Sequence, residues 1–242
     1  MQGNGGKVIL PEFVLSSRVD QHWNYSGIDS IQQCFDIEHF KTYPHKISYD
    51  YNSRGFRDEE WPDDLSNAIW CFGDSFTVGI GCPREHTWTY LLKKQTNRPT
   101  INVSMDGASN QWIARKCLAI IQEINPKTIV IQWSYTHRRE SNNITLSDED
   151  RRLPNIKTTV ADDIKDTIDC IGRLEKAKTG RVIHSFIPEF IDQENKKLFN
   201  LALSRSAEQL IPEFAILDLA RDGRHYDIKT AQQFVNAVVQ LF

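Results

Sequence analysis

The stretch AIWCFGDSF, residues 68–76, decides how the rest of the chain is interpreted. Its first five residues are apolar without a break, as in a strand that is covered on both faces of a sheet. Gly73, Asp74 and Ser75 follow directly, so the chain turns where the strand ends. In α/β proteins, ligands bind at the carboxyl edge of the sheet. The sequence therefore predicts an exposed hydroxyl, that of Ser75, at this edge.

Apolar runs and amphipathic segments alternate from this stretch to the end of the chain. Such alternation predicts an α/β fold with a mainly parallel sheet flanked by helices and joined by right-handed crossovers. Pro126 ends the second helix, for which Asn110 is the predicted N-cap. The polar residues 134–159 are predicted to be a long loop or insertion, and Arg138 and Arg139 in it to lie on a solvated face. Strands are predicted over residues 68–72, 100–103, 128–133, 182–186 and 214–217, and helices over 87–94, 110–124, 161–177, 198–210 and 228–242.

Residues 1–66 do not follow this rhythm, and their composition is aromatic and polar. We expect them to be an N-terminal extension that packs on a main domain formed by residues 67–242. Within the extension, the segment YNSRGFR at 51–57 is expected to be a structural turn beside the first strand. We find no internal repeat.

The bulk composition limits the classes of partner. The chain has 242 residues, of which 40% are hydrophobic, and a net charge of −3 from 29 basic and 32 acidic residues. This balance does not favour a nucleic-acid partner. No apolar run approaches the roughly 20 residues that span a bilayer, and no secretory signal is seen. Five scattered cysteines without a CxxC pair fit a reducing compartment, so a cytoplasmic or otherwise intracellular location is expected.

A second motif, DGRH at residues 222–225, follows the last predicted strand. A serine hydroxyl is a weak nucleophile until a base removes its proton, and histidine is the usual base. A carboxylate on the other imidazole nitrogen fixes the tautomer and stabilises the imidazolium. His225 and Asp222 are therefore the candidate base and orienting acid for Ser75, with Gly223 as the turn between them.

These motifs resemble the SGNH, or GDSL, hydrolase family over residues 67–242. GDSF at 73–76 resembles its first block, and NVSMDG at 102–107 resembles its second. Residues 222–225 resemble its last block, before the expected C-terminal helix. The resemblance implies a three-layer α/β/α sandwich with a flavodoxin-like sheet. It also implies that Ser75 is the nucleophile and that the backbone N–H groups of Ser75 and Gly107 form the oxyanion hole.

The third block of the family departs from its usual pattern here. The family places Gly-x-Asn-Asp after the strand at 128–133, where this chain reads WSYTHRRE at 133–140. Thr136 falls at the position of the Asn that donates to the oxyanion, and Asn110 is another candidate donor. Losing one such donor typically costs roughly 3–4 kcal/mol in the transition state.

Several other side chains are assigned structural roles or left as alternatives. Asp74 is predicted to accept N–H groups of its turn, and His137 is a possible but exposed second base. Trp133 and Tyr135 are candidates for lining a pocket, and Trp112 is expected in the core.

The expected function is hydrolysis of carboxylic esters through an acyl-enzyme, without metal or other cofactor. The resemblance implies esterase, lipase, thioesterase or carbohydrate deacetylase activity on a small-molecule or glycan ester. A small acyl group, such as acetyl on a glycan, is favoured. Two alternatives stay open: acyl transfer to a sugar hydroxyl, and a catalytically impaired binding or structural module on the same fold. The altered third block and the long polar loop motivate the second.

Overall fold

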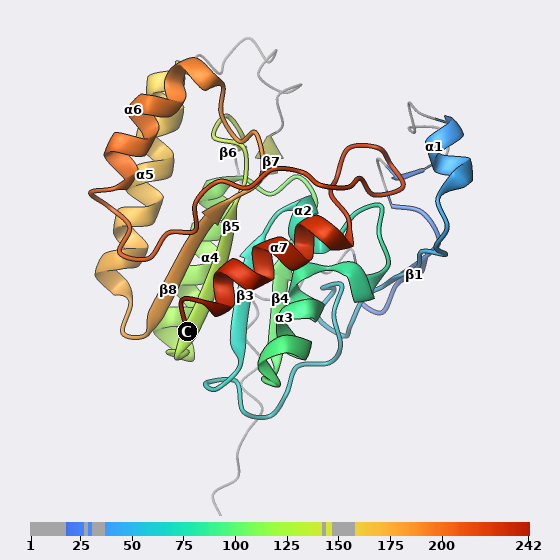
Figure 1. The fold of residues 1–242 in the computed structure, drawn as a ribbon. Coiled ribbons are helices and arrows are strands. Elements are labelled where there is room, and N and C mark those ends of the chain that lie inside the picture. Colours follow the sequence, from blue (N-terminus) through green and yellow to red (C-terminus); the bar gives the residue numbers. More distant parts are fainter. Residues whose placement is uncertain (1–17, 27–28, 31–36, 142–143, 147–157) are drawn as a thin grey trace, which may run out of the picture.

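A four-stranded parallel sheet forms the centre of the molecule (Figure 1). The computed structural model describes residues 18–26, 29–30, 37–141, 144–146 and 158–242. The strand order is β4-β3-β5-β8, and all three pairings are parallel. Nearly every strand residue is buried, as the apolar runs predict. The strands are β3 (Ile69–Gly73), β4 (Thr100–Ser104), β5 (Thr128–Trp133) and β8 (Arg181–Phe186).

Helices cover both faces of this sheet, which confirms the predicted three-layer α/β/α sandwich (Figure 1). On one face α3 (Trp88–Thr96) packs against α7 (Ile228–Val239), and on the other α4 (Asn110–Glu123) packs against α5 (Val160–Ala177). Each of the four begins at a side chain that accepts a backbone N–H, the usual N-cap chemistry. The cap of α4 is Ser109 and not Asn110 as predicted, because the Asn110 side chain has other partners.

The predicted strand over residues 214–217 is wrong. Beyond β8 the chain makes a single parallel bridge, between His184 and Leu210, and then leaves the sheet. Pro212 follows Ile211, and it has no N–H to continue a ladder. The predicted helix at 198–210 is also displaced, since α6 covers Gln193–Leu203.

Part of the predicted long loop at 134–159 is regular. Strand β6 (Arg139–Ser141) pairs antiparallel with β7 (Ile144–Leu146). Residues 142–143 and 147–157 of this prediction lie outside the described residues.

The described N-terminal part contains α1 (Ile37–Thr42) and a two-stranded antiparallel sheet of β1 (His22–Trp23) and β2 (Tyr49–Asp50). Residues 1–17 of the expected extension lie outside the described residues, and its boundary at residue 66 stays a prediction. Figure 1 shows α1 and β1 beside the loops that follow α2 (Ser75–Val78) and precede α7. Over the described ranges, no helix has the length and apolar character that crossing a membrane requires.

Candidate active site

The short helix α2 places Ser75 at the carboxyl end of β3. Asp74 caps this helix, and its Oδ1 accepts the Phe76 N–H at 3.1 Å. Gly73 is needed here because a Cβ atom would lie 2.0 Å from Thr77 Oγ1. The helix therefore starts close against the strand, and Ser75 is its first residue. Ser75 is only 2% exposed, so the expectation of an exposed hydroxyl is wrong.

Ser75 is covered because the loop that bears the DGRH motif folds over it. His225 Nε2 lies 2.8 Å from Ser75 Oγ, and His225 Nδ1 lies 2.6 Å from Asp222 Oδ2. The His225 ring also packs on Phe76, with 4.5 Å between ring centroids. The structure thus brings together the three side chains that the sequence singled out, across 150 residues of chain.

These contacts determine the tautomer of His225. An ionised carboxylate only accepts hydrogen bonds, so His225 Nδ1 carries the proton that Asp222 accepts. Neutral His225 then presents Nε2 as an acceptor, and the Ser75 hydroxyl donates to it. This is the arrangement in which a base removes the serine proton.

Asp222 is itself held by its own turn. Its Oδ1 accepts the backbone N–H groups of Arg224 and His225, each at 3.0 Å. Gly223 adopts a left-handed conformation, with φ of 68°, as a tight turn between Asp222 and His225 requires. The predicted role of this glycine is confirmed.

The pKa shifts of the pair follow from burial and from mutual attraction. Burial alone would lower the pKa of His225, but the hydrogen bond and charge of Asp222 outweigh it, and the net shift is upward. Burial would raise the pKa of Asp222, but His225 and two backbone N–H groups lower it. Asp222 is therefore ionised wherever His225 titrates.

Asp74 has partners beyond its turn that the sequence did not indicate. Its Oδ2 accepts from Ser134 Oγ at 2.6 Å and from Arg138 Nη1 at 2.8 Å. The prediction of a solvated pair at Arg138 and Arg139 is wrong, because Arg139 in turn pairs with Asp163 at 2.6 Å. Arg138 thus ties the loop after β5 to the residue before Ser75. The sequence feature that could have predicted such a partner is an acid next to a serine at the end of an apolar run, because a carboxylate buried there needs hydrogen-bond donors.

The candidate oxyanion donors are placed very differently from one another. Within the described residues, the backbone N–H groups of Ser75 and Gly107 have no protein acceptor. Gly107 has a φ of 74° and open space where a Cβ would stand. Asn110, in contrast, donates both amide hydrogens, to Ser134 O and Thr167 Oγ1 at 3.2 Å each. In this arrangement the Asn110 amide joins α4 to the loop after β5 and α5 and has no hydrogen left for an oxyanion.

Thr136 lies in the loop after β5, where the third block predicts a donor. It is 6% exposed, and its backbone N–H donates to Phe190 O at 3.3 Å. The backbone of this loop is thereby tied to the loop that follows β8.

The aromatic residues singled out by the sequence belong mostly to the core. Trp112 is 4% exposed, as expected, but Trp133 is completely buried and does not line a pocket. Trp133 Nε1 donates to His184 Nδ1 at 3.0 Å, and the two rings stack. Tyr135 is half-buried and stacks on His137. Across the described residues, no cluster of three or more His, Cys, Asp or Glu side chains is arranged to hold a metal.

Comparison with known proteins gives the class of the fold. No family model and no curated protein matches the sequence. Solved structures do match, among them TesA, at a TM-score of 0.52 and 15% identity over 72% of this chain and 97% of TesA. A lipolytic G-D-S-L family protein from Veillonella parvula matches at a TM-score of 0.50 and 17% identity, over 73% of this chain and 98% of that protein.

A family two carbohydrate esterase from Clostridium thermocellum, solved with cellohexaose, matches at a TM-score of 0.51 and 11% identity. The match covers 74% of this chain and 64% of that protein. The chain has the fold of the SGNH, or GDSL, hydrolases, which confirms the resemblance drawn from its motifs.

Proposed function

We propose that this protein is a serine hydrolase that cleaves carboxylic esters through an acyl-enzyme. The observation that carries the proposal is the hydrogen-bonded series from Ser75 Oγ to His225 Nε2 and from His225 Nδ1 to Asp222. It stands at the carboxyl edge of a parallel sheet, where this fold class binds its ligands.

The reaction takes place in two halves. Ser75 Oγ attacks the ester carbonyl while its proton passes to His225 Nε2, and Asp222 stabilises the resulting imidazolium. Collapse of the tetrahedral intermediate breaks the bond to the alcohol, which leaves with the proton from His225. Water then attacks the acyl-enzyme, His225 takes a proton from it, and the acid departs as Ser75 recovers its hydrogen.

The oxyanion of both intermediates is assigned to the backbone N–H groups of Ser75 and Gly107. Both lack acceptors within the described residues, and the space over Gly107 is open. Thr136 is the proposed third donor, and Asn110 is not retained because its amide hydrogens are taken.

The proposed substrate carries a small acyl group, such as acetyl on a glycan hydroxyl. Ser75 is 2% exposed and His225 is 6% exposed, and this limited access is the support for a small acyl group. The glycan part is supported only by the shared fold with a carbohydrate esterase.

Substitution of Ser75 tests the proposal. We expect Ser75→Ala to reduce turnover of p-nitrophenyl acetate by more than about 1,000-fold and to abolish labelling by a fluorophosphonate. The control is Ser185→Ala, which removes a buried serine hydroxyl that donates to Ile131 O in the sheet. Equal turnover in the wild type and Ser75→Ala would contradict the proposal and favour the binding-module alternative.

A further inference from the structure

The loop that carries Asp222 and His225 is flanked on both sides by contacts with the N-terminal part of the chain. Arg221 directly precedes Asp222, and Asp227 follows His225 by two residues. The partners of both flanks come from residues 24–49 and from the loop after α2. None of these contacts takes part in the ester chemistry itself.

Arg221 is bound by Asp29 in a two-point ion pair. Arg221 Nε donates to Asp29 Oδ1 at 2.9 Å, and Nη2 donates to Asp29 Oδ2 at 2.5 Å. The Asp29 side chain is completely buried, and that of Arg221 is 11% exposed. Charged pairs with this parallel geometry are stronger and more directional than single contacts. The residue before Asp222 is therefore fixed in orientation as well as in place.

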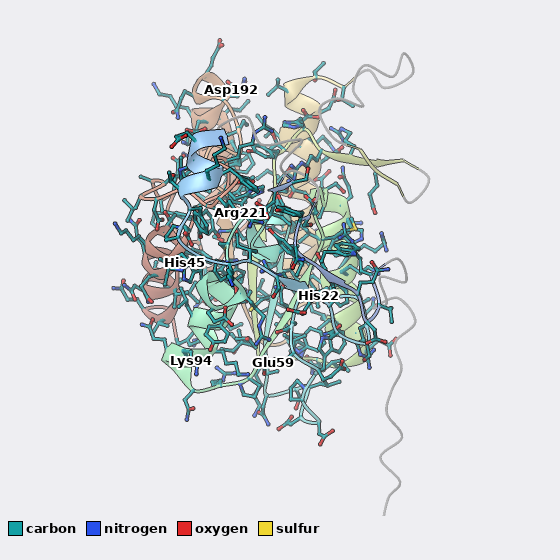
Figure 2. The ribbon with its side chains drawn as sticks, turned by 90° about the vertical axis from the view of Figure 1, so that its right-hand side faces the viewer. His22, His45, Glu59, Lys94, Asp192 and Arg221 are labelled. Carbon is teal, nitrogen blue, oxygen red and sulfur yellow. The ribbon has the colours of Figure 1, made fainter. Side chains whose placement is uncertain are left out.

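Arg221 also contacts two aromatic rings and makes a backbone hydrogen bond. Its guanidinium carbon lies 4.7 Å from the ring centre of Phe40 in α1 and 5.2 Å from that of Tyr25. Figure 2 looks onto this face and labels Arg221 close below α1. The Arg221 backbone N–H also donates to Gly81 O at 2.8 Å, in the loop that follows the nucleophile helix.

Asp29 also connects Arg221 to Gly81, through the side chain of Tyr49. Tyr49 Oη donates to Asp29 Oδ2 at 2.5 Å, and the Gly81 N–H donates to Tyr49 Oη at 2.8 Å. The four residues Arg221, Asp29, Tyr49 and Gly81 thus close a ring of hydrogen bonds. This ring links the loop that bears the base to the loop that follows the nucleophile.

The other flank is held in a similar way. Tyr43 Oη donates to Asp227 Oδ2 at 2.5 Å, and His86 Nδ1 lies 2.7 Å from Asp227 Oδ1. His39 Nε2 lies 2.8 Å from Ala220 O, directly before Arg221. Residues 220–227 are therefore attached at both ends.

We propose that Asp29 and Arg221 are positioning residues, through which the N-terminal segment acts as a clamp that holds Asp222 and His225 in register with Ser75. The proposal rests on the ester-hydrolase function proposed above. Loops are the mobile parts of a fold, and a misplacement of about 1 Å can cost roughly 100-fold in rate. The two-stranded sheet and α1 are thus part of the active-site architecture and not an accessory to it.

Two substitutions of opposite charge test the clamp. Asp29→Asn removes a negative charge from the partner of Arg221, and Arg221→Met removes a positive charge from the loop that bears His225. Through charge alone, the first would lower the pKa of His225 and the second would raise it or leave it unchanged. A loosened Asp222 would lower it in both, because Asp222, Asp106 and Asp74 are the groups that raise it.

We expect both variants to lower kcat roughly 10- to 100-fold with little change in KM, and to move the acid limb of the pH profile to lower pH. Arg221→Lys keeps the charge without the two-point geometry and should be intermediate. Tyr43→Phe loosens only the other flank and is the milder variant if Arg221→Met does not fold.

The matched control is Glu175→Gln, on α5 at the opposite edge of the sheet. Glu175 pairs with Lys178 at 2.6 Å and contacts His184 at 2.9 Å, with its side chain 14% exposed. This variant loses a comparable ion pair without touching residues 220–227, so kcat and the pH profile should stay as in the wild type.

A readout independent of turnover separates the clamp from the proposed function. Titration of the His225 imidazole by NMR reports its pKa even in an inactive protein. Opposite pKa shifts in the two variants, or a kcat equal to that of Glu175→Gln, would overturn the clamp. Wild-type turnover that does not depend on Ser75, with the pKa of His225 still falling in both variants, would overturn the ester-hydrolase function and support the clamp.

Discussion

His225 is the residue on which the proposed chemistry depends, because it must be neutral to accept the Ser75 proton. Asp222 makes this harder in acid, since it stabilises the charged imidazolium and raises the pKa of His225 despite burial. The same attraction makes His225 a stronger base once it is neutral. The pair therefore has less activity in mild acid, and at higher pH it has a better proton acceptor.

The pH dependence of activity follows from this shift. We expect kcat/KM to fall as pH decreases through a single ionisation that lies above the ordinary histidine value of about 6.5. Asp222→Asn should move this ionisation to lower pH and reduce kcat by about 10⁴-fold, because the tautomer is no longer fixed. The measurement is kcat/KM for p-nitrophenyl acetate from pH 5 to 9, and a flat profile in the wild type would exclude His225 as the base.

The contribution of His225 to stability should change with pH in the opposite sense from activity. The raised pKa of His225 means that the folded state holds its proton more tightly than the unfolded chain does. This contribution is fully present below the unfolded pKa and is lost as pH rises through the folded pKa.

At the scale of the elements, the sequence predicts the sheet better than the segments around it. The strand at 69–73 is recognisable as an unbroken apolar run, and those at 100–104 and 128–133 as short segments rich in β-branched residues. The run at 214–217 looks similar, but Pro212 and the end of the ladder at Leu210 exclude it from the sheet. A local pattern does not show whether a neighbouring strand is present to pair with.

In the candidate site, too, local motifs predict some residues, whereas contacts between residues far apart in the sequence are seen only in the structure. Ser75, Asp222 and His225 were found because short motifs carry them. The contacts of Asp29 with Arg221 span 192 residues, and no local pattern pairs them. The third-block departure was visible, but only the structure shows that Asn110 is occupied elsewhere.

The loop after α2 offers a test of how closely Asp222 is held. A Cβ atom on Gly81 would lie 2.9 Å from Ala220 Cβ and 3.1 Å from Asp222 Oδ1, and the φ of this residue is 80°. We expect Gly81→Ala to lose roughly 1–2 kcal/mol of stability from the left-handed backbone and to lower kcat by displacing Asp222. Thermal unfolding and turnover of the purified variant measure the two effects.

Gly79→Ala serves as the control for that variant. Gly79 has a similar φ of 77°, but its added Cβ would meet Thr87 Cγ2 at 2.3 Å and not Asp222. It should lose stability with a smaller fall in kcat. If the two variants lower kcat equally, the close approach of Gly81 to Asp222 is not what limits activity.

At the scale of the whole molecule, Arg57 joins the N-terminal part to α2 and to the loop that follows it. Its guanidinium donates to the carbonyl oxygens of Val78, the last residue of α2, and of Gly79 and Cys82 in the loop that follows, and to Ser48 O before β2. It also lies over the Tyr49 ring at 4.2 Å. Arg57 is 3% exposed, so these carbonyls have no water to replace it.

Loss of this side chain should therefore destabilise the entire fold. We expect Arg57→Met to lower the free energy of unfolding by about 3 kcal/mol, because several buried carbonyls lose a charged donor at once. Arg57→Lys should recover only part of this loss, since a single ammonium cannot reach acceptors on both segments. Urea unfolding followed by tryptophan fluorescence measures both.

Arg54→Met is the control, because Arg54 lies over the Trp61 ring at 4.3 Å near the surface and its loss should cost about 0.5 kcal/mol. Equal losses in Arg57→Met and Arg54→Met would mean that the N-terminal part adds little to the stability of the sheet domain, and that its attachment depends on the contacts around Arg221 alone.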